Sequence, residues 1–443
     1  MKRKSVFLWS VVIALGGFLF GFDTAVISGA EQSIQKYWSL SAFEHGLTVS
    51  IALIGTVIGA LLGAIPSDRL GRKKTLYLIA ALYLISSLGT SLSTNWFVFL
   101  IFRFLGGLGV GASSVTAPIF ISEISPAARR GKLVGLFQFN VVFGIVVSYF
   151  SNYLIGLSGL HSWRWMLGIQ AVPSAVFLLI LRFVPESPRW LITKRGKIEE
   201  AREIFRMIDP LTADRIVAEI RKTDQEEKSI IQNDPLFSTR YRTPVMLAML
   251  FAMFNQFSGI NAIIYYSPRI FEMTGLGKSS SLLSTAGLGV INFIFTLLAM
   301  NFIDKIGRKT LMTIGSFGLI FTLAMVSYSF YQGDFNKWSV PVFLFTYIAF
   351  FAFSQGAVIW VFISEIFPGP VRARGQTLGS TTHWIMAALI AFSFPYLSEK
   401  AGGGNTFLFF CVMMCLQLVF VWKLMPETKG RSLEQIEHAL VLH

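Results

Sequence analysis

Apolar stretches separated by short charged or turn-rich breaks follow one another along the whole 443-residue chain. A helix needs roughly 20 apolar residues to cross a bilayer, and each stretch is about that long. The stretches lie near 6–30, 46–66, 75–93, 96–122, 133–155, 163–184, 243–272, 281–303, 310–331, 340–367, 376–398 and 405–425. This pattern predicts an all-α membrane protein with twelve transmembrane helices.

The composition agrees with a membrane location. The chain is 53% hydrophobic and 14% charged, whereas soluble domains carry about 25% charged residues. So few charges do not solvate a soluble protein of this length. The first apolar stretch shows no small-residue cleavage site, so we interpret it as a retained helix and not as a signal peptide.

The net charge of +14 is informative because of its distribution along the chain. If the N-terminus is cytoplasmic, 31 of the 38 Lys and Arg residues lie in loops on the cytoplasmic side and Arg103 lies within a span. The opposite loops carry the other six, which are Lys36, Arg164, Arg269, Lys278, Lys337 and Lys400. The positive-inside rule therefore predicts two cytoplasmic termini, and the basic charge does not indicate nucleic-acid binding.

The longest polar stretch divides the chain into two halves. We predict an N-terminal bundle of six helices over 1–184, a cytoplasmic helical linker over 185–242, a C-terminal bundle over 243–425 and a cytoplasmic tail over 426–443. Apolar residues recur in the linker at helical spacing at Ile198, Ala201, Phe205, Ile208, Ile216 and Ile220. This spacing predicts short amphipathic helices on the cytoplasmic membrane face. The alternative is a disordered linker, because the charges there are mixed.

The two halves share three short motifs in the same order. DRLGRK at 68–73 recurs as DKIGRK at 304–309, SEI at 122–124 recurs as SEI at 364–366, and PES at 185–187 recurs as PET at 426–428. The spacing between copies is nearly constant. A duplicated, pseudo-symmetric six-helix unit explains it, and transporters built from such repeats place their substrate between them at mid-membrane.

These motifs carry a resemblance to a known family. GGFLFGFDT at 16–24, the two DxxGRK loops, PESPRWL at 185–191, QFSGIN at 256–261 and PETKG at 426–430 stand in order and in the expected loops. Over essentially its whole length the chain resembles the sugar porter family of the major facilitator superfamily. The resemblance implies the major facilitator fold and sugar transport by alternating access.

Asp23 in the first stretch and Arg103 in the fourth are the candidate proton-coupling residues. A carboxylate in hydrocarbon needs a partner or a proton. Burial favours the protonated acid and a nearby arginine favours the ionised acid, so a moving arginine can bind and release the proton alternately. An aspartate at this place paired with an arginine in helix four is similar to proton symporters, whereas facilitators tend to carry a neutral residue. The alternative is a static ion pair that locks two helices together.

Sugar recognition needs uncharged donors and acceptors together with aromatic faces that cover the ring. The resemblance implies a substrate site inside the helices, formed by Phe20, Thr24, Gln138, Asn255, Gln256, Asn261, Asn292, Trp360, His383 and Trp384. For each amide alone, the alternative role is a hydrogen bond between helices. Gln256 and Asn261 do not share a face of a regular helix, so we expect local unwinding at Gly259.

Two of these residues depart from the family pattern, which leaves the choice of sugar open. Asn255 stands where a second glutamine is frequent, and His383 stands where asparagine or glutamine is expected. His383 is either a neutral hydrogen-bonding substitute or a titrating group that joins the proton path. The segment before Trp360 also lacks a proline that is often seen there.

Charged residues recur at equal spacing in the predicted cytoplasmic loops of both halves. The candidate network comprises Asp68, Arg72, Glu123, Arg130, Glu186, Asp304, Arg308, Glu365, Arg372 and Glu427. The resemblance implies that these charges form an ionic latch between the halves in one state of the transport cycle. The alternative role is to set the topology of the chain.

The sequence argues against other classes of protein. The five histidines, His45, His161, His383, His438 and His443, are scattered, and no metal-ligand spacing, phosphate loop or nucleophile motif is found, so we expect neither an enzyme nor a metal site. A transport-dead sugar receptor is expected to carry long cytoplasmic extensions, and this chain stops about 18 residues after its last helix. A channel is disfavoured because no ring of charge or filter-like loop is present.

The sequence as a whole predicts a monomeric proton-coupled symporter of a monosaccharide, either a hexose or a pentose. The alternatives are an uncoupled sugar facilitator, against which Asp23 argues, and a proton symporter of a cyclitol or polyol. The expected partners are a small-molecule sugar, the proton and the lipid bilayer, with no nucleic acid and no cofactor. The expected location is a bacterial inner membrane.

Overall fold

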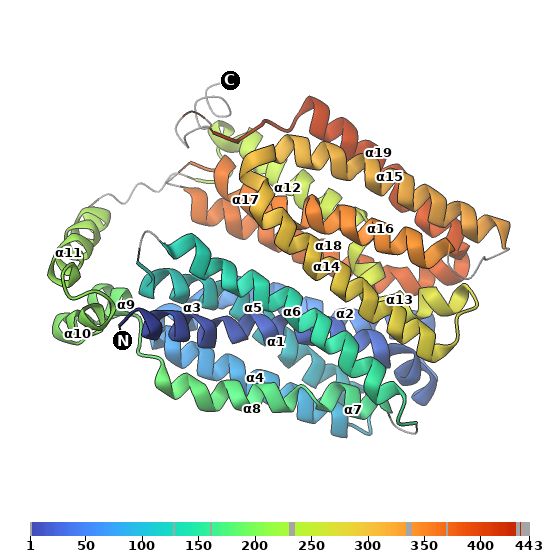
Figure 1. Ribbon diagram of the computed structural model, residues 1–443, viewed down its shortest axis with the longest axis horizontal. Coiled ribbons are helices and arrows are strands. Elements are labelled where there is room, and N and C mark those ends of the chain that lie inside the picture. Colours follow the sequence, from blue (N-terminus) through green and yellow to red (C-terminus); the bar gives the residue numbers. More distant parts are fainter. Residues whose placement is uncertain are drawn as a thin grey trace. The chain divides into compact units, whose positions relative to one another are not determined.

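The computed structural model describes residues 2–126, 129–159, 162–229, 235–333, 339–368, 371–430 and 435, and all regular elements in these ranges are helical (Figure 1). The elements up to residue 208 are α1 (Lys2–Tyr37), α2 (Ala42–Leu62), α3 (Ala64–Leu70), α4 (Arg72–Leu92), α5 (Trp96–Ile124), α6 (Arg130–Gly156), α7 (Ser162–Gly168), α8 (Ala171–Ile180), η2 (Leu181–Phe183), α9 (Pro188–Arg195) and α10 (Ile198–Ile208). The later elements are α11 (Ala213–Ser229), η3 (Thr239–Tyr241), α12 (Arg242–Phe257), α13 (Ile260–Met273), α14 (Lys278–Ile306), α15 (Arg308–Gln332), α16 (Ser339–Phe353), α17 (Gln355–Ile366), α18 (Arg372–Lys400) and α19 (Gly402–Lys423).

Eleven helical segments in the described ranges are long and apolar enough to cross a membrane. Each corresponds to a predicted stretch. The remaining predicted stretch, 376–398, corresponds to α18, which is 29 residues long but is interrupted by polar residues such as Thr381, Thr382 and His383. The all-helical fold with twelve membrane-length helices is therefore the predicted one.

Three of the membrane-length segments, Ser162–Phe183, Thr239–Met273 and Ser339–Ile366, are broken helices. The predicted unwinding at Gly259 is confirmed, because this residue separates α12 from α13 and has a left-handed backbone with φ 84°. A second break, which the sequence did not reveal, lies at Ser354 between α16 and α17. The Tyr347 hydroxyl donates to the backbone oxygen of Ser258 at 2.8 Å, so a side chain from α16 satisfies a carbonyl that the break in α12 frees. A third break separates α7 from α8.

Three short helices follow the first six predicted spans, as expected for the linker. Ser187 accepts from the backbone N–H of Trp190 at the start of α9, and Gly196 with φ 65° ends it. Side chains from α9, α10 and α11, including Trp190, Ile204 and Val217, are buried together in one apolar cluster. This packing confirms the amphipathic helices, and the disordered alternative is wrong for residues 188–229.

Contacts divide the chain into two compact units. Unit 1 comprises Met1–Thr24, Gly55–Ile145 and Leu167–Asn233, and unit 2 comprises Ala25–Ile54, Val146–Met166 and Asp234–His443. The boundaries fall inside α1, α2, α6 and α7, so unit 2 contains segments from the first half of the sequence. The division into bundles over 1–184 and 243–425 stays a prediction.

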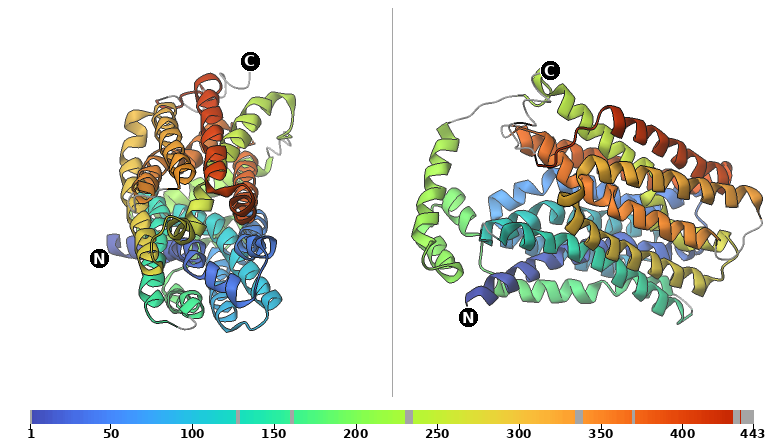
Figure 2. Two further views of the ribbon diagram at one scale, coloured as in Figure 1. Left: turned by 90° about the vertical axis from the view of Figure 1, so that its right-hand side faces the viewer. Right: turned by 45° about the horizontal axis from the view of Figure 1, so that its top comes forward.

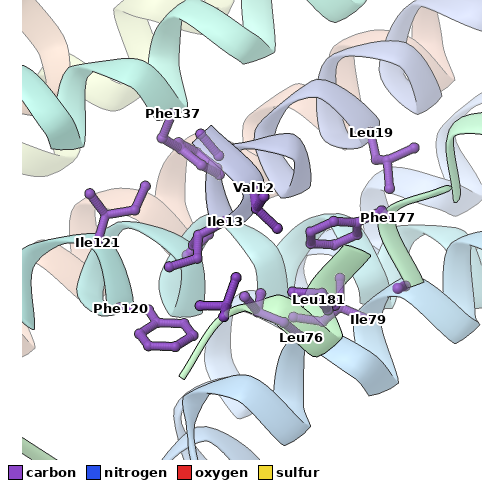
Figure 3. Packing of buried hydrophobic residues seen from close by; sticks show 14 of the residues in the cluster. Val12, Ile13, Leu19, Leu76, Ile79, Phe120, Ile121, Phe137, Phe177 and Leu181 are labelled. Carbon is purple, nitrogen blue, oxygen red and sulfur yellow. The ribbon is translucent and has the colours of Figure 1, made fainter. Parts of the chain in front are cut away.

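The core of unit 1 lies between α1, α4, α5, α6 and α8. Figure 3 shows Val12 and Ile13 from α1 against side chains of these helices. The other labelled members of the cluster are Leu19, Leu76, Ile79, Phe120, Ile121, Phe137, Phe177 and Leu181. Since lipid is as apolar as these side chains, close packing and not burial from water holds the helices together.

The core of unit 2 is built in the same way. The rings of Phe251 on α12 and Phe362 on α17 meet edge to face with centroids 5.3 Å apart. In Figures 1 and 2, α15 and α19 run side by side along their length. Aromatic pairs of this kind add about 0.5–1.5 kcal/mol beyond their buried area.

Glycines allow the closest helix approaches. A Cβ atom at Gly21 on α1 would overlap the backbone carbonyl oxygen of Val141 on α6. We expect Gly21→Ala to remove most folded protein from detergent extracts, because backbone atoms cannot yield. Gly131→Ala is the matched control, since nothing lies within 4 Å of the added Cβ. The measurement is the melting temperature and monodisperse yield by fluorescence-detected size exclusion. Equal yields for both variants would contradict the packing.

Candidate functional site

Asp23 and Arg103 form an ion pair inside unit 1. Arg103 Nη1 lies 3.3 Å from Asp23 Oδ1, and their side chains are each 2% exposed. Charge-assisted hydrogen bonds between such groups are usually about 2.7–2.9 Å long, so this pair is loosely made. Arg103 Nε is buried with no hydrogen-bond partner in the part of the chain described here. Arg103 therefore makes one contact with Asp23, and its Nε–H donor is left without a partner among the described residues.

The local sequence allows Asp23 to lie against α5. A Cβ atom at Gly106 would lie 3.4 Å from Asp23 Oδ1 and 2.5 Å from Ser86 Oγ. The missing side chain at Gly106, one turn after Arg103, thus leaves room for Ser86 on α4, and an added Cβ would only touch the Asp23 carboxylate. Both predicted proton-coupling residues are brought together by the structure. Their roles stay a prediction.

Four of the predicted sugar-site residues form one hydrogen-bonded group in unit 2, centred on Gln256. Gln256 Oε1 accepts from Asn261 Nδ2 at 2.5 Å, and Gln256 Nε2 donates to Asn255 Oδ1 at 2.9 Å. The same amide nitrogen lies 3.2 Å from Nδ1 and 3.3 Å from Nε2 of His383 on α18. The break at Gly259 lets Gln256 and Asn261, five residues apart, meet.

The group favours a neutral His383. An amide NH₂ only donates, so the ring nitrogen that faces Gln256 accepts and carries no proton. The contact fits a neutral hydrogen-bonding His383, and which of its two predicted roles it has stays a prediction.

Two tryptophans flank this amide group. The rings of Trp360 on α17 and His383 lie with centroids 4.9 Å apart, and Trp360 is 39% exposed whereas Trp384 is 7% exposed. An exposed aromatic face beside satisfied amides is the arrangement that a sugar ring requires.

The other predicted sugar-site residues make no hydrogen bond to this group within the described residues. Phe20, Thr24 and Gln138 belong to unit 1, where the Phe20 ring packs 6.4 Å from that of Phe137. Thr24 Oγ1 donates to the backbone oxygen of Phe20. Asn292 is half-buried on α14 and makes no hydrogen bond to the Gln256 group within the described ranges. A joint site formed by both units stays a prediction.

The charged motif of the first half is a compact network in unit 1. Arg72 Nε and Nη2 donate to the two oxygens of Glu123 at 2.9 and 3.0 Å. Arg72 Nη1 donates to Asp68 Oδ1 at 2.8 Å. Glu186 Oε1 accepts from the backbone N–H of Lys73 at 3.0 Å and from that of Ser187 at 2.8 Å.

Unit 2 repeats the side-chain contacts of this network. Arg308 donates to both oxygens of Glu365, at 2.7 and 3.2 Å, and its Nη1 lies 2.9 Å from Asp304. Glu427 accepts from the backbone N–H groups of Arg308 and Lys309 at 2.9 and 3.0 Å. The internal repeat read from the sequence is thus also a repeat of geometry.

Two members of the predicted network do not join it in this structure. Arg130 is exposed at the start of α6, and Arg372 Nε donates to the backbone oxygen of Phe367 at 3.0 Å. Within the described residues, Glu123 and Glu365 pair with Arg72 and Arg308 and not with the arginines seven positions later. A latch between the halves stays a prediction.

The pKa values of the two equivalent carboxylates, Glu186 and Glu427, are shifted in opposite directions. Burial raises the pKa of Glu186 above its usual value, although backbone N–H groups oppose this shift. Burial also acts on Glu427, but the backbone N–H donors, led by that of Lys429, outweigh it and lower the pKa of Glu427. The ionised form is therefore favoured by the fold at Glu427 and disfavoured at Glu186.

This difference predicts unequal effects of removing each charge. At pH 7 we expect Glu427→Gln to lower the melting temperature more than Glu186→Gln, because only the first loses a stabilised charge. The stabilisation by Glu427 is fully present above the usual glutamate pKa of 4.5 and is lost as the pH falls through the lowered pKa of Glu427 in the folded protein. Melting curves of both variants and the wild type from pH 8 to 4 test this. A larger loss for Glu186→Gln at pH 7 would contradict it.

The sequence did not reveal a third cluster of buried charge, formed by Glu31, His45 and Arg269 in unit 2. We expected helix one to end at residue 30 and helix two to begin at 46, whereas α1 continues to Tyr37 and α2 begins at Ala42. Arg269, expected in a loop, lies within α13. The sequence signal that was available for this cluster is the pair of polar residues Glu31 and Gln35, which lie one helical turn apart.

A buried ion pair in membrane-length helices, a polar group beside broken helices and a duplicated charge network define a multi-pass membrane transporter. A family model described as sugar (and other) transporter matches residues 9–440, and the chain belongs to this family. It is therefore a transporter and not an enzyme.

Individual relatives match over nearly the full length. The chain is 39% identical over 441 residues to the arabinose-proton symporter of Bacillus subtilis, with 98% of this chain and 94% of the relative covered. It is 38% identical to the glucose transporter GlcP of Staphylococcus epidermidis, with 99% and 98% covered. The inward-open structure of the xylose transporter XylE from E. coli is similar with a TM-score of 0.87 and 34% identity, covering 98% of this chain and 100% of that one.

Proposed function

We propose that this protein is a proton-coupled symporter of a monosaccharide, a hexose or a pentose, that works by alternating access. The observation that carries the proposal is the buried, loosely bonded pair of Asp23 and Arg103. A buried aspartate is costly in a membrane protein and marks proton and substrate pathways. The relatives support the substrate class, since they are named for arabinose, glucose and xylose and one is a proton symporter.

Asp23 is the proton carrier and Arg103 its modulator. While Arg103 contacts the carboxylate, the ionised acid is favoured. When α5 shifts so that the 3.3 Å contact opens, the unpaired carboxylate is buried and takes a proton to become neutral. A neutral Asp23 no longer holds Arg103, so the two helices can move relative to each other.

The sugar binds to the amides and aromatic faces named above. Asn255, Gln256 and Asn261 present donors and acceptors in fixed positions because they hold one another. Each can exchange its protein partner for a sugar hydroxyl without leaving a buried polar atom unsatisfied. Gln138, Phe20 and Thr24 from the first unit complete the site in the proposal.

The rest of the proposal concerns location and partners. Both termini are cytoplasmic, and the basic loops described above support this topology by the positive-inside rule. The protein functions as a monomer in a bacterial inner membrane, in contact with lipid, and needs no cofactor besides the coupling proton.

The test is sugar-induced proton uptake in proteoliposomes. Purified protein is challenged with arabinose, xylose, glucose, galactose and inositol, and external pH is followed with a dye. Alkalinisation that depends on one sugar establishes symport and names the substrate. Sugar flux without proton movement makes the protein an uncoupled facilitator, and proton uptake only with inositol makes it a cyclitol symporter.

A further inference from the structure

A second buried titratable cluster lies in unit 2, away from the Asp23 pair. His45 Nε2 on α2 lies 2.6 Å from Glu31 Oε2 on α1. Arg269 on α13 binds the same carboxylate through both ends, with Nε at 3.1 Å and Nη2 at 2.8 Å. Arg269 Nη2 also donates to Gln35 Oε1 at 2.5 Å.

The side chains of this cluster are largely buried, so the stability of their arrangement depends on the charge that each one carries. The side chains of Glu31 and His45 are 0% exposed, and that of Arg269 is 23% exposed. Removing one partner of a buried ion pair leaves an uncompensated buried charge. A change in the charge of any member therefore affects how α1, α2 and α13 are held against one another.

His45 has an empty acceptor. Its Nε2 faces a carboxylate and so carries the hydrogen. Nδ1 is then a lone-pair acceptor, and it is buried with no hydrogen-bond partner among the described residues. A buried polar atom left unpaired costs about 1–3 kcal/mol. Nδ1 is thus the atom on which a proton can be added without breaking an existing bond.

The cluster joins two parts of the chain. Glu31 and His45 belong to segment Ala25–Ile54 and Arg269 to segment Asp234–His443, both of unit 2. Apolar contacts accompany the ionic one, since Phe43 meets Phe392 at 5.1 Å and Tyr149 on α6 donates to the backbone oxygen of Ile264. In the proposed topology this is the non-cytoplasmic end of the helices.

Other charges at this end are balanced. From α13, Tyr266 and Glu272 interact electrostatically with Glu31, and Lys278 on α14 acts on Glu272. Lys36 on α1 and Glu399 on α18 line a cavity of about 630 Å³ together with Arg269 and Glu272. The carboxylate of Glu44, beside His45 in sequence, accepts from the Ser41 backbone N–H and hydroxyl. A proton on His45 is therefore opposed mainly by Arg269 and favoured by Glu31, its direct partner.

We propose that Glu31, His45 and Arg269 form a second proton-binding site, distinct from Asp23, which fastens the non-cytoplasmic ends of the two sequence halves when His45 is protonated. Protonation at Nδ1 makes His45 a cation and adds a Coulombic attraction to the Glu31 carboxylate, which already accepts the Nε2 hydrogen. Acid conditions then slow every step that needs these ends to separate.

The first test measures separation of these ends without sugar. Ser267 on α13 is 0% exposed, so a Ser267→Cys side chain becomes available to a membrane-impermeant maleimide only when the ends open. Cys411 and Cys415, both free, are first replaced by alanine. At each pH, labelling of the protein with His45 is divided by labelling of the His45→Gln variant. This ratio cancels the pH dependence of thiol reactivity.

The expected result is that labelling with His45 present, relative to His45→Gln, falls about three- to tenfold between pH 8 and 5. Lys36→Gln is the control for loss of a charge at the same end, since Lys36 is exposed. Labelling of the protein with Lys36 relative to Lys36→Gln should stay near one at all pH values. A ratio for His45→Gln that does not change with pH overturns the proposal.

A second readout rests on the proposed function. Sugar counterflow at equal pH on both sides needs no proton gradient, and we expect the wild type to slow toward pH 5 and His45→Gln to lose this acid limb. Absence of counterflow in the wild type refutes sugar transport but leaves the labelling result standing. In the background of the double variant Glu31→Gln/Arg269→Gln, which removes both charged partners of His45, labelling with His45 present relative to His45→Gln should no longer change with pH. Retention of the wild-type acid limb in His45→Gln overturns the proposal.

Discussion

Asp23→Asn abolishes sugar-induced proton uptake and uphill sugar accumulation, while sugar exchange continues. The variant keeps an oxygen that can accept from Arg103 but has no proton to give up, so the carrier is fixed in its neutral form. The loss of coupling should be complete within error, at least about 100-fold. The measurement is accumulation of the preferred sugar in proteoliposomes with an imposed pH gradient, beside counterflow without a gradient.

Controls separate this effect from damage to the fold. Asp214→Asn makes the same substitution in a surface ion pair, in which Asp214 on α11 contacts Arg202 on α10. This variant should accumulate sugar like the wild type. Asp23→Asn also leaves Arg103 buried without a charged partner, so its melting temperature should fall. Uphill accumulation by Asp23→Asn at the wild-type level would reduce the pair to a static link between α1 and α5.

Much of the fold follows from the sequence because the membrane imposes simple rules. Every backbone group must be bonded within the span, so apolar length alone predicts a helix. The duplicated motifs predicted more than topology, since Arg72 and Arg308 bind Glu123 and Glu365 in the same way. Arg130 and Arg372 were predicted as members of the network but do not join it in this structure, because the sequence pattern does not reveal which neighbouring helix is nearer.

Helix ends were the weakest part of the prediction, and the missed site lies there. Polar residues near a helix end resemble a loop, so Glu31 and His45 fell just outside the predicted helices. Buried partners on α1, α2 and α13 make them part of the membrane-length helices instead. The break at Ser354 was missed for a different reason: a serine, unlike Gly259, gives no backbone signal in the sequence.

Gln256→Ala is expected to weaken sugar binding by about 10- to 100-fold, which corresponds to about 1.4–2.8 kcal/mol. Gln256 is bonded to Asn255 and Asn261 and faces His383, so the substitution removes one sugar contact and releases the side chains that position the others. A site built to bond hydroxyls loses more than one contact when its central group is removed. The measurement is KM for uptake together with sugar-dependent quenching of tryptophan fluorescence.

Gln417→Ala is the matched control because it removes another buried glutamine of the same unit. Gln417 on α19 donates to Ser316 Oγ on α15 at 2.8 Å, between two helices that hold none of the proposed sugar contacts. Its loss should lower the melting temperature and leave KM unchanged, whereas Gln256→Ala should raise KM more than the change in stability explains. If both variants lower stability alike and neither alters KM, the Gln256 group is a link between α12 and α18 and the sugar binds elsewhere.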